Sequence, residues 1–149
     1  MSKIGDSTLI VCTALSSIIV DSENKVYDSR DNCNAIIESA TNKLIAGCKA
    51  TTIPNTVTTI GDHAFHNCSE LTSVTIPNSV REIGAYAFYY CRGLTSVTIP
   101  NSVAKIGLNA FYECRGLTSL SIPSSVTEID LNAFSYCTGL SSIIVDSEN

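Results

Sequence analysis

The residues of this 149-residue chain that could act as nucleophiles or bind zinc are seven cysteines and two histidines. Both histidines, His63 and His66, lie close to Cys68, and a cysteine beside a histidine can form the nucleophile and base of a hydrolase. That chemistry needs an exposed thiolate, whereas the internal repeat described below predicts that Cys68 is buried beside Phe65. We therefore interpret the pair as two surface histidines on a turn, and we expect no catalytic residues and no enzymatic activity.

Metal binding has two candidate sets of ligands. Five cysteines occupy one equivalent position in successive repeats, which places them in a line and not around one point, and no CxxC or Cys-His pairing indicates zinc. Carboxylates in the segment DSENKVYDSRDN could bind calcium, but the regular D-x-D-x-D-G spacing is missing, which favours a solvated acidic loop. We predict no metal and no cofactor. The residues considered are Cys12, Cys68, Cys91, Cys114 and Cys137 for zinc, and Asp21, Glu23, Asp28 and Asp31 for calcium.

The composition excludes several functional classes. Hydrophobic residues make up 44% of the chain and charged residues only 15%, so the chain can build a core and is not a disordered linker. A net charge of -5 without a basic patch argues against nucleic acid and against anionic membranes as partners. The apolar run from Leu9 to Val20 has the size of a signal-peptide core and is too short to span a bilayer. Because the decapeptide LSSIIVDSEN, which begins inside this run at Leu15, recurs at residues 140–149, we interpret the run as structural, with no export signal and no membrane insertion.

The chain is dominated by an internal repeat of 23 residues. Four units follow one another without a gap, and the second and third share sixteen of twenty-three residues. Repeats of this length predict stacked coils, each of which needs a neighbour to cover its apolar face. We predict a single solenoid over residues 1–149. It comprises a partial coil at 4–19, a long irregular unit at 20–52, four short repeats at 53–144 and the start of a further repeat at 145–149.

Each short repeat can be divided into local elements. The segment LTSVTIP alternates like a half-buried strand, and such strands should stack in parallel. Pro77 ends the strand, and Gly84 suits a position of positive φ or of close approach. The stretch AYAFYYC predicts one helical or 3₁₀ turn that buries Phe88 and Cys91. The aligned phenylalanines should form a stacked core column: Phe65, Phe88, Phe111 and Phe134.

The long unit should contain a β-hairpin. NAIIES and KLIAGC flank a short polar link and predict two paired strands that bulge from the solenoid. Cys33 and Cys48 lie on opposite sides of this hairpin. Because the strand register is unknown from sequence, both a disulfide and two free thiols remain open for this pair. The five repeat cysteines, by contrast, are expected to be buried thiols that act as small hydrophobic side chains.

The repeat carries the motif I-P-x-S-V-x-x-I-G-x-x-A-F-x-x-C-x-x-L, which in the second unit runs from Ile76 to Leu94. With this motif the chain resembles the BspA-like leucine-rich repeats of bacterial surface proteins, which are also expanded in some parasitic protists. The resemblance implies an α/β leucine-rich-repeat solenoid with parallel strands, short helical or 3₁₀ turns and one hairpin-bearing long repeat. It further implies a non-catalytic binding or adhesion module of a longer cell-surface or secreted protein that contacts a host protein or glycan.

Two surfaces are candidates for that binding. Outward-pointing strand residues form a weakly polar face, and tyrosines and arginines, which are enriched at binding hot spots, gather on a turn. The alternatives are an ice-binding hydroxyl column, tyrosines that only cover the flank of the solenoid, and a purely structural spacer that holds a functional domain away from the cell. The candidates are Ser73, Thr75, Ser96, Thr98, Ser119 and Ser121 on the strand face, and Tyr86, Tyr89, Tyr90, Arg92, Tyr112, Arg115 and Tyr136 on the turn.

The ends of the chain show no polar capping unit, although solenoids normally close with one. The repeat pattern starts at Ile4 in the middle of a coil, and the sequence stops at Asn149 just after a predicted strand. We therefore expect a fragment of a longer array, with apolar edges that favour end-to-end association into a homo-oligomer.

Overall fold

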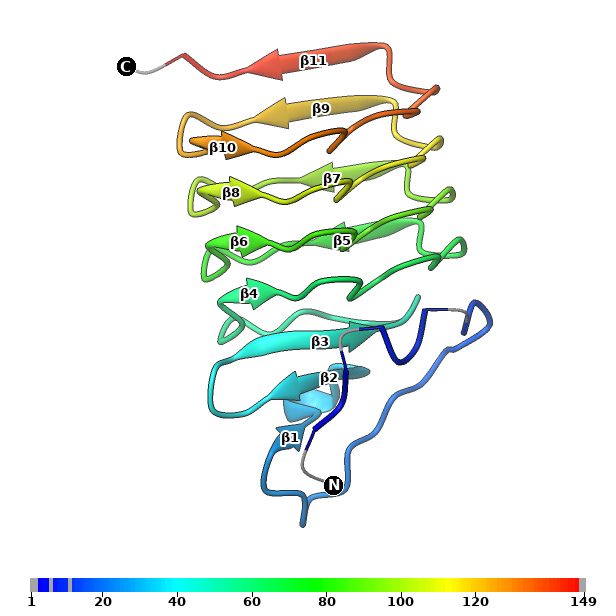
Figure 1. Cartoon of the computed structure of the whole chain (residues 1–149), viewed down its shortest axis with the longest axis vertical. Helices are drawn as coiled ribbons and strands as arrows, with labels where there is room; N and C mark the ends of the chain where they lie inside the picture. Colours follow the sequence, from blue (N-terminus) through cyan, green and yellow to red (C-terminus); the bar gives the residue numbers. More distant parts are fainter. Residues whose placement is uncertain (1–2, 6, 11, 148–149) are drawn as a thin grey trace.

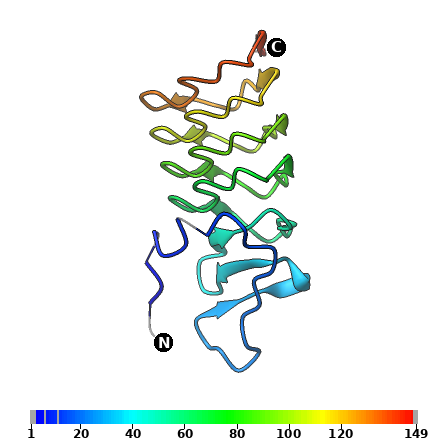
Figure 2. The same cartoon turned by 90° about the vertical axis from the view of Figure 1, so that its right-hand side faces the viewer.

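The chain folds as a solenoid of stacked coils, described here from a computed structural model (Figure 1). The structure describes residues 3–5, 7–10 and 12–147. Seen from the side, the coils lie one above another, with the hairpin unit at one end of the stack and the C-terminal coil at the other (Figure 2). The predicted solenoid of parallel strands is confirmed.

Two rows of strands line the coils, and the sequence predicted only one of them. The second row forms a seven-stranded sheet, in which the last four strands are two-residue segments in parallel register. This sheet has the order β1 (Tyr27–Asp28), β2 (Ala35–Glu38), β3 (Lys43–Gly47), β4 (Thr59–Ile60), β6 (Glu82–Ile83), β8 (Lys105–Ile106) and β10 (Glu128–Ile129). The predicted row consists of two parallel pairs, β5 (Ser73–Thr75) with β7 (Ser96–Thr98), and β9 (Ser119–Ile122) with β11 (Ser142–Val145).

The hairpin was predicted correctly, but its place in the fold was not. Strands β2 and β3 pair antiparallel, and β1 adds a third antiparallel strand. The hairpin does not bulge out, because β3 also pairs in parallel with β4 and so continues the long sheet. A three-residue 3₁₀ helix, η1 (Arg30–Asn32), precedes β2. Cys33 and Cys48 are buried free thiols, so the option of a disulfide between them is not realised.

The predicted helical or 3₁₀ turn is present only as separate i to i+3 turns, and the predicted burial of Phe88 and Cys91 is confirmed. In the stretch that contains Phe88, the backbone forms isolated i to i+3 hydrogen bonds, such as Cys91 N–H to the Phe88 carbonyl at 3.1 Å, and no continuous helix. The remaining amides bond across to the next coil, as Phe88 N–H does with the Ala110 carbonyl at 2.7 Å. Gly84 also has no positive φ; instead, a Cβ there would lie 2.5 Å from the Asp62 carboxylate, so the close approach of two coils requires glycine.

The core is a column of identical side chains. Phe65, Phe88 and Phe111 are fully buried and stack with ring centroids 5.0 and 4.9 Å apart, while Phe134 in the last coil is half-buried and lies 5.3 Å from Phe111. The three inner thiols are buried beside them and donate hydrogen bonds to phenylalanine carbonyls of the preceding coil. These bonds are Cys91 Sγ to Phe65 O at 3.0 Å, Cys114 Sγ to Phe88 O at 3.2 Å and Cys137 Sγ to Phe111 O at 3.1 Å.

The N-terminal segment departs from the predicted coil. Cys12 is exposed and Cys68 is half-buried, so the expectation of five shielded thiols is wrong at these two positions. The segment packs Leu9 and Leu15 against a second apolar cluster built by the hairpin, and Ile4 N–H donates to the Tyr27 hydroxyl at 2.6 Å. Within the described residues, no helix has the length and apolar character needed to cross a bilayer.

Candidate functional site

Aromatic side chains gather along one edge of the stack, on the turns that follow the long sheet. We call this surface the aromatic flank. Its rings stack from coil to coil, as His63 does on Tyr86 at 4.8 Å and Tyr89 on Tyr112 at 5.0 Å. The structure therefore brings together the seven turn residues predicted from the sequence and adds two histidines. The flank consists of His63, His66, Tyr86, Tyr89, Tyr90, Arg92, Tyr112, Arg115 and Tyr136.

The backbone holds several of these residues in the left-handed region. Tyr86, Tyr90 and Tyr136 have φ values of 57°, 60° and 59°. Equivalent turns in other coils carry asparagine at this conformation, for example Asn67 and Asn109. Asparagine tolerates left-handed φ, whereas a bulky side chain costs about 1–2 kcal/mol there. Three tyrosines of the aromatic flank thus occupy positions that the backbone alone would assign to other residue types.

An acidic residue and two arginines lie together on one side of the aromatic flank. Glu113 is buried and accepts hydrogen bonds from Arg92 at 3.0 Å and from Arg115 at 2.9 Å. Burial raises the pKa of the Glu113 carboxyl, but the hydrogen bonds from the two guanidinium groups outweigh this effect and lower it. The Arg92 guanidinium also lies 4.7 Å above the centre of the Tyr90 ring. Arg92 is therefore held by both a carboxylate and an aromatic ring, and Arg115 by the carboxylate.

The hydroxyls of Tyr89 and Tyr112 remain neutral at physiological pH. Burial and, next, the hydrogen bond with Tyr90 raise the pKa of Tyr89 to about 12. Burial also raises the pKa of Tyr112, with Tyr136 as the next contributor. The flank consequently offers uncharged phenol groups together with guanidinium groups, a combination that contacts peptide carbonyls and carboxylates.

The two histidines lie on a turn, as the sequence predicted, and both are half-buried there. Their Nδ1 atoms are 3.0 Å apart, and burial followed by the charge of His63 lowers the pKa of His66. Burial raises the pKa of Cys68 to about 12, which keeps this residue a thiol at neutral pH and does not favour Cys-His nucleophilic chemistry.

The strand face is exposed as predicted but is divided. All six of its candidate residues point outward, from Ser73 to Ser121, and the register aligns Ser73 with Ser96 and Ser119 with Ser142. The β5–β7 and β9–β11 pairs are separate two-stranded sheets, so the hydroxyl column is not one continuous ladder. Exposed apolar side chains interrupt it at Ile144 and Ile19.

Two carboxylates of the acidic loop, Asp21 and Asp28, bond to other groups of the protein. Asp28 forms an ion pair with Arg30 at 2.6 Å and accepts a hydrogen bond from Ser39 at 2.5 Å. Asp21 accepts a hydrogen bond from the Glu23 amide at 2.8 Å. Across the described part of the chain, no group of three or more histidine, cysteine or acidic residues is placed to hold a metal ion.

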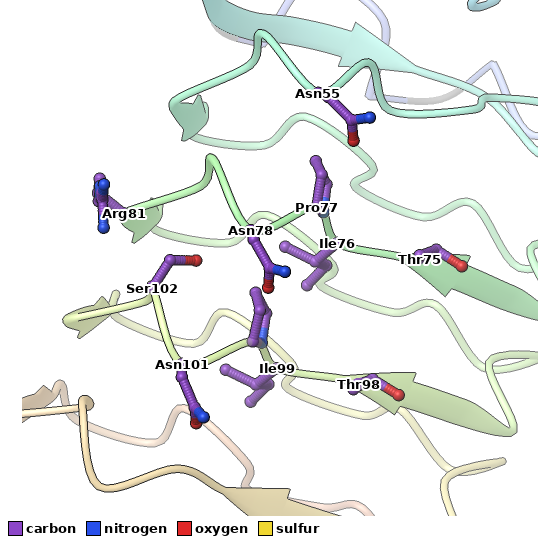
Figure 3. Close-up of a pocket in the computed structure, with 11 residues that line it drawn as sticks. Asn55, Thr75, Ile76, Pro77, Asn78, Arg81, Thr98, Ile99, Asn101 and Ser102 are labelled. Carbon is purple, nitrogen blue, oxygen red and sulfur yellow. The ribbon is translucent and has the colours of Figure 1, made fainter.

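Sequence reasoning missed one set of residues, the asparagines of the Ile-Pro-Asn turns. Asn55, Asn78 and Asn101 are exposed and lie at equivalent points of successive coils, where they line a shallow groove of about 840 Å³ (Figure 3). Thr75 and Thr98 of the strand face border the same groove. The repeated IPN triplet was the available signal, but we interpreted it only as a turn.

Comparison with known proteins identifies the repeat. The model of the BspA type leucine-rich repeat region matches residues 35–149 in six copies. A leucine-rich cell surface protein from Faecalibacterium prausnitzii is 32% identical, with a TM-score of 0.70, over 93% of this chain and 44% of that one. A leucine-rich repeat protein from Bacteroides capillosus is 25% identical, with a TM-score of 0.64, over 84% of this chain and 97% of that one.

A third solved structure, the pneumococcal vaccine antigen PcpA, shares the fold, with a TM-score of 0.79 at 20% identity over 88% of this chain and 33% of that one. The chain spans less than half the length of the Faecalibacterium protein. No curated protein matched the chain. The family model covers most of the sequence, and the motif, the coil length and the stacked strands agree with it. The chain belongs to the BspA-type leucine-rich repeat family.

Proposed function

We propose that the chain is a non-catalytic binding module of a cell-surface or secreted protein, and that it contacts a protein ligand through the aromatic flank. The leucine-rich repeat family is generally non-catalytic and is typical of protein-binding repeats. Its neighbours include a cell surface protein and a pneumococcal vaccine antigen, which supports a location outside the cell and a role in adhesion.

The stacking of the aromatic rings in the flank favours a protein over a glycan as the ligand of this surface. A sugar ring stacks on an exposed aromatic face, but here the faces of Tyr89 and Tyr112 cover each other and Arg92 covers Tyr90. Along these stacked turns, a ligand meets mainly ring edges, hydroxyls and guanidinium groups, and Tyr136 at the end of the row adds an exposed ring. Such groups bind peptide carbonyls, carboxylates and apolar side chains, and tyrosine and arginine are the residue types that dominate protein interfaces.

The strained backbone of the flank supports the same proposal. Tyrosine at a left-handed position costs stability that asparagine would spare, and such outliers cluster at functional sites. Tyr136 illustrates this, because 62% of its surface is exposed and it has only one ring contact in the described residues, a tilted one with Tyr112.

The experiment measures binding of fluorescent tetramers of the chain to epithelial cells, before and after the cell-surface proteins are removed with trypsin. We expect saturable, trypsin-sensitive binding. The double variant Tyr89→Ala/Tyr112→Ala should weaken it by about 30-fold or more, because truncation of hot-spot tyrosines costs about 2 kcal/mol or more. Thr127→Ala, an exposed residue outside the flank, is the matched control and should bind as the unmodified chain does.

Two results would contradict the proposal. Binding that is unchanged in the tyrosine variant, while its urea unfolding shows an intact fold, would place the ligand elsewhere. If the unmodified tetramer binds no cells, a purely structural spacer is the better description.

A further inference from the structure

A second surface, separate from the aromatic flank, lies where the outer strands turn into the long sheet. Each coil turns there at an Ile-Pro-Asn or Ile-Pro-Ser triplet, and the groove of about 840 Å³ crosses two such turns. A further hollow of about 620 Å³ adjoins it and shares Asn55, Thr75 and Pro77. Figure 3 shows Asn55, Asn78 and Asn101 in one column, with Thr75 and Thr98 to one side and Arg81 to the other.

The three amides are free to bind a ligand. All three asparagines are exposed, and their side chains form no hydrogen bond with any residue that the structure describes. The turn itself does not need them. In the next coil Ser124 occupies the same position, and the turn closes in the same way: Val126 N–H donates to Pro123 O at 3.1 Å, against 3.0 Å from Val80 to Pro77.

The groove is almost uncharged. Its lining consists of amides, hydroxyls and the apolar surfaces of isoleucine and proline, with Arg81 as the one charged side chain. Among the described residues Arg81 forms no ion pair, so its guanidinium N–H groups are available as donors. Each carboxamide supplies two donors and one acceptor, which matches a ligand rich in hydroxyl groups. The net charge of -5 disfavours a polyanion.

The spacing of the column distinguishes between two neutral ligands. Neighbouring coils are 4.9 to 5.0 Å apart, as the stacked phenylalanine rings show. An extended peptide presents equivalent groups only every second residue, at about 6.6–6.8 Å, and so loses register with the column after two coils. A sugar chain carries several hydroxyls on every ring and has no such restriction. We propose that the groove lined by Asn55, Asn78, Asn101 and Arg81 is a binding site for a neutral oligosaccharide.

The repeat itself offers a matched pair of variants. Asn78→Ser/Asn101→Ser installs the residue that the chain already has at Ser124, so the turns should fold unchanged. Ser124→Asn extends the column by a fourth amide. The probes are cello-, chito-, laminari- and xylo-hexaose, with hexagalacturonate as the acidic counterpart, and the dissociation constants are measured by calorimetry or ligand-observed NMR.

At least one neutral hexasaccharide should bind the unmodified chain. Each lost amide contact should weaken binding about fivefold, and Ser124→Asn should tighten it by a similar factor. Ser119→Ala, which lies outside the groove, and Tyr89→Ala/Tyr112→Ala should leave the affinity unchanged, which separates this site from the protein-binding flank. The inference is overturned if no neutral hexasaccharide binds with a dissociation constant below about 1 mM. It also fails if the asparagine variants bind as before, or if hexagalacturonate binds tighter than every neutral probe.

Discussion

Truncating the phenylalanine column should destabilise the protein in a way that depends on position in the stack. Phe111 is fully buried between Phe88 at 4.9 Å and Phe134 at 5.3 Å. Phe134 is half-buried and contacts one ring of the column among the described residues. We therefore expect Phe111→Ala to cost clearly more stability than Phe134→Ala.

The magnitude follows from burial and stacking. Removing a fully buried phenylalanine ring costs about 3–5 kcal/mol, part of which is the loss of aromatic pairs at about 0.5–1.5 kcal/mol each. Phe134→Ala loses one such pair and less buried surface, so about half that cost is expected. For a chain of this size, 3–5 kcal/mol corresponds to a fall in melting temperature of about 6–20 °C.

Urea unfolding, followed by circular dichroism and by tyrosine fluorescence, measures both variants. The two probes should be compared because repeat arrays can unfold coil by coil. Ser119→Ala in the same coil as Phe111 is exposed and should change stability by less than about 0.5 kcal/mol. A loss below 1 kcal/mol at Phe111, or an equal loss at both positions, would refute the stacked-column reasoning.

Four further predictions concern the thiols, pH, backbone strain and association. A thiol reagent should label Cys12 rapidly in the native protein and the buried cysteines only on unfolding; fast labelling of all seven would contradict the core assignment. Arg30 lowers the pKa of Asp28 to about 2, below its unfolded value, so its ion pair stabilises the fold above about pH 4 and is lost as the pH falls towards 2. Asp28→Asn should remove that dependence, worth about 1 kcal/mol after solvent screening, in acid titrations monitored by circular dichroism. Tyr136→Asn should raise the free energy of unfolding by up to about 1 kcal/mol in urea titrations. A clear fall in that free energy would show that the left-handed backbone at Tyr136 is not strained. Because Ser142–Val145 exposes Ile143, Ile144 and Val145 at 53%, 60% and 68%, the mass from light scattering should rise with concentration, whereas a constant monomer would contradict end-to-end association.

The solenoid could be predicted because one apolar pattern recurs in every coil. Val80, Ile83, Phe88 and Leu94 are fully buried, and each has equivalents 23 residues away. A single coil cannot cover such a row, so stacking follows from the repeat alone. The second row of strands could not be predicted in the same way, because segments of two residues, such as β6, are too short to show alternation.

The N-terminal coil and the turns were predicted less well for local reasons. Alignment placed Cys12 on Cys68, but Leu9 replaces the phenylalanine that holds the other coils together, and this segment packs on the hairpin cluster instead. The left-handed backbone of the turns could not be predicted from the sequence, because tyrosine and glutamate do not indicate a positive φ. Tyr90 and Glu113 both adopt one.

The candidate surfaces could be predicted where they follow from the 23-residue repeat and not where they depend on contacts between particular side chains. The seven predicted tyrosines and arginines do meet on one flank, because the 23-residue period places them at neighbouring turns. Sequence alone did not show that His63 and His66 stack on the tyrosines of the next coil. It also did not show that Arg92 and Arg115 both bind Glu113, because these contacts join different coils or opposite sides of one turn. The asparagine column was overlooked because turn chemistry already explained each residue singly.

Backbone bonding explains why the turns can vary at all. In the flank, Phe65 N–H donates to Ala87 O and Phe88 N–H to Ala110 O, so each turn is held by the coil beside it whatever side chain it presents. One turn position of the repeat is therefore histidine at 63, tyrosine at 86 and asparagine at 109, with φ between 53° and 58° in all three. The core positions must stay the same for the coils to stack, and the turn positions are free to differ. A binding surface in such a protein is consequently sought at two kinds of turn position. In one, the residue departs from the type that the backbone favours, as Tyr86, Tyr90 and Tyr136 do. In the other, the turn does not require the residue present, as with the exposed asparagines.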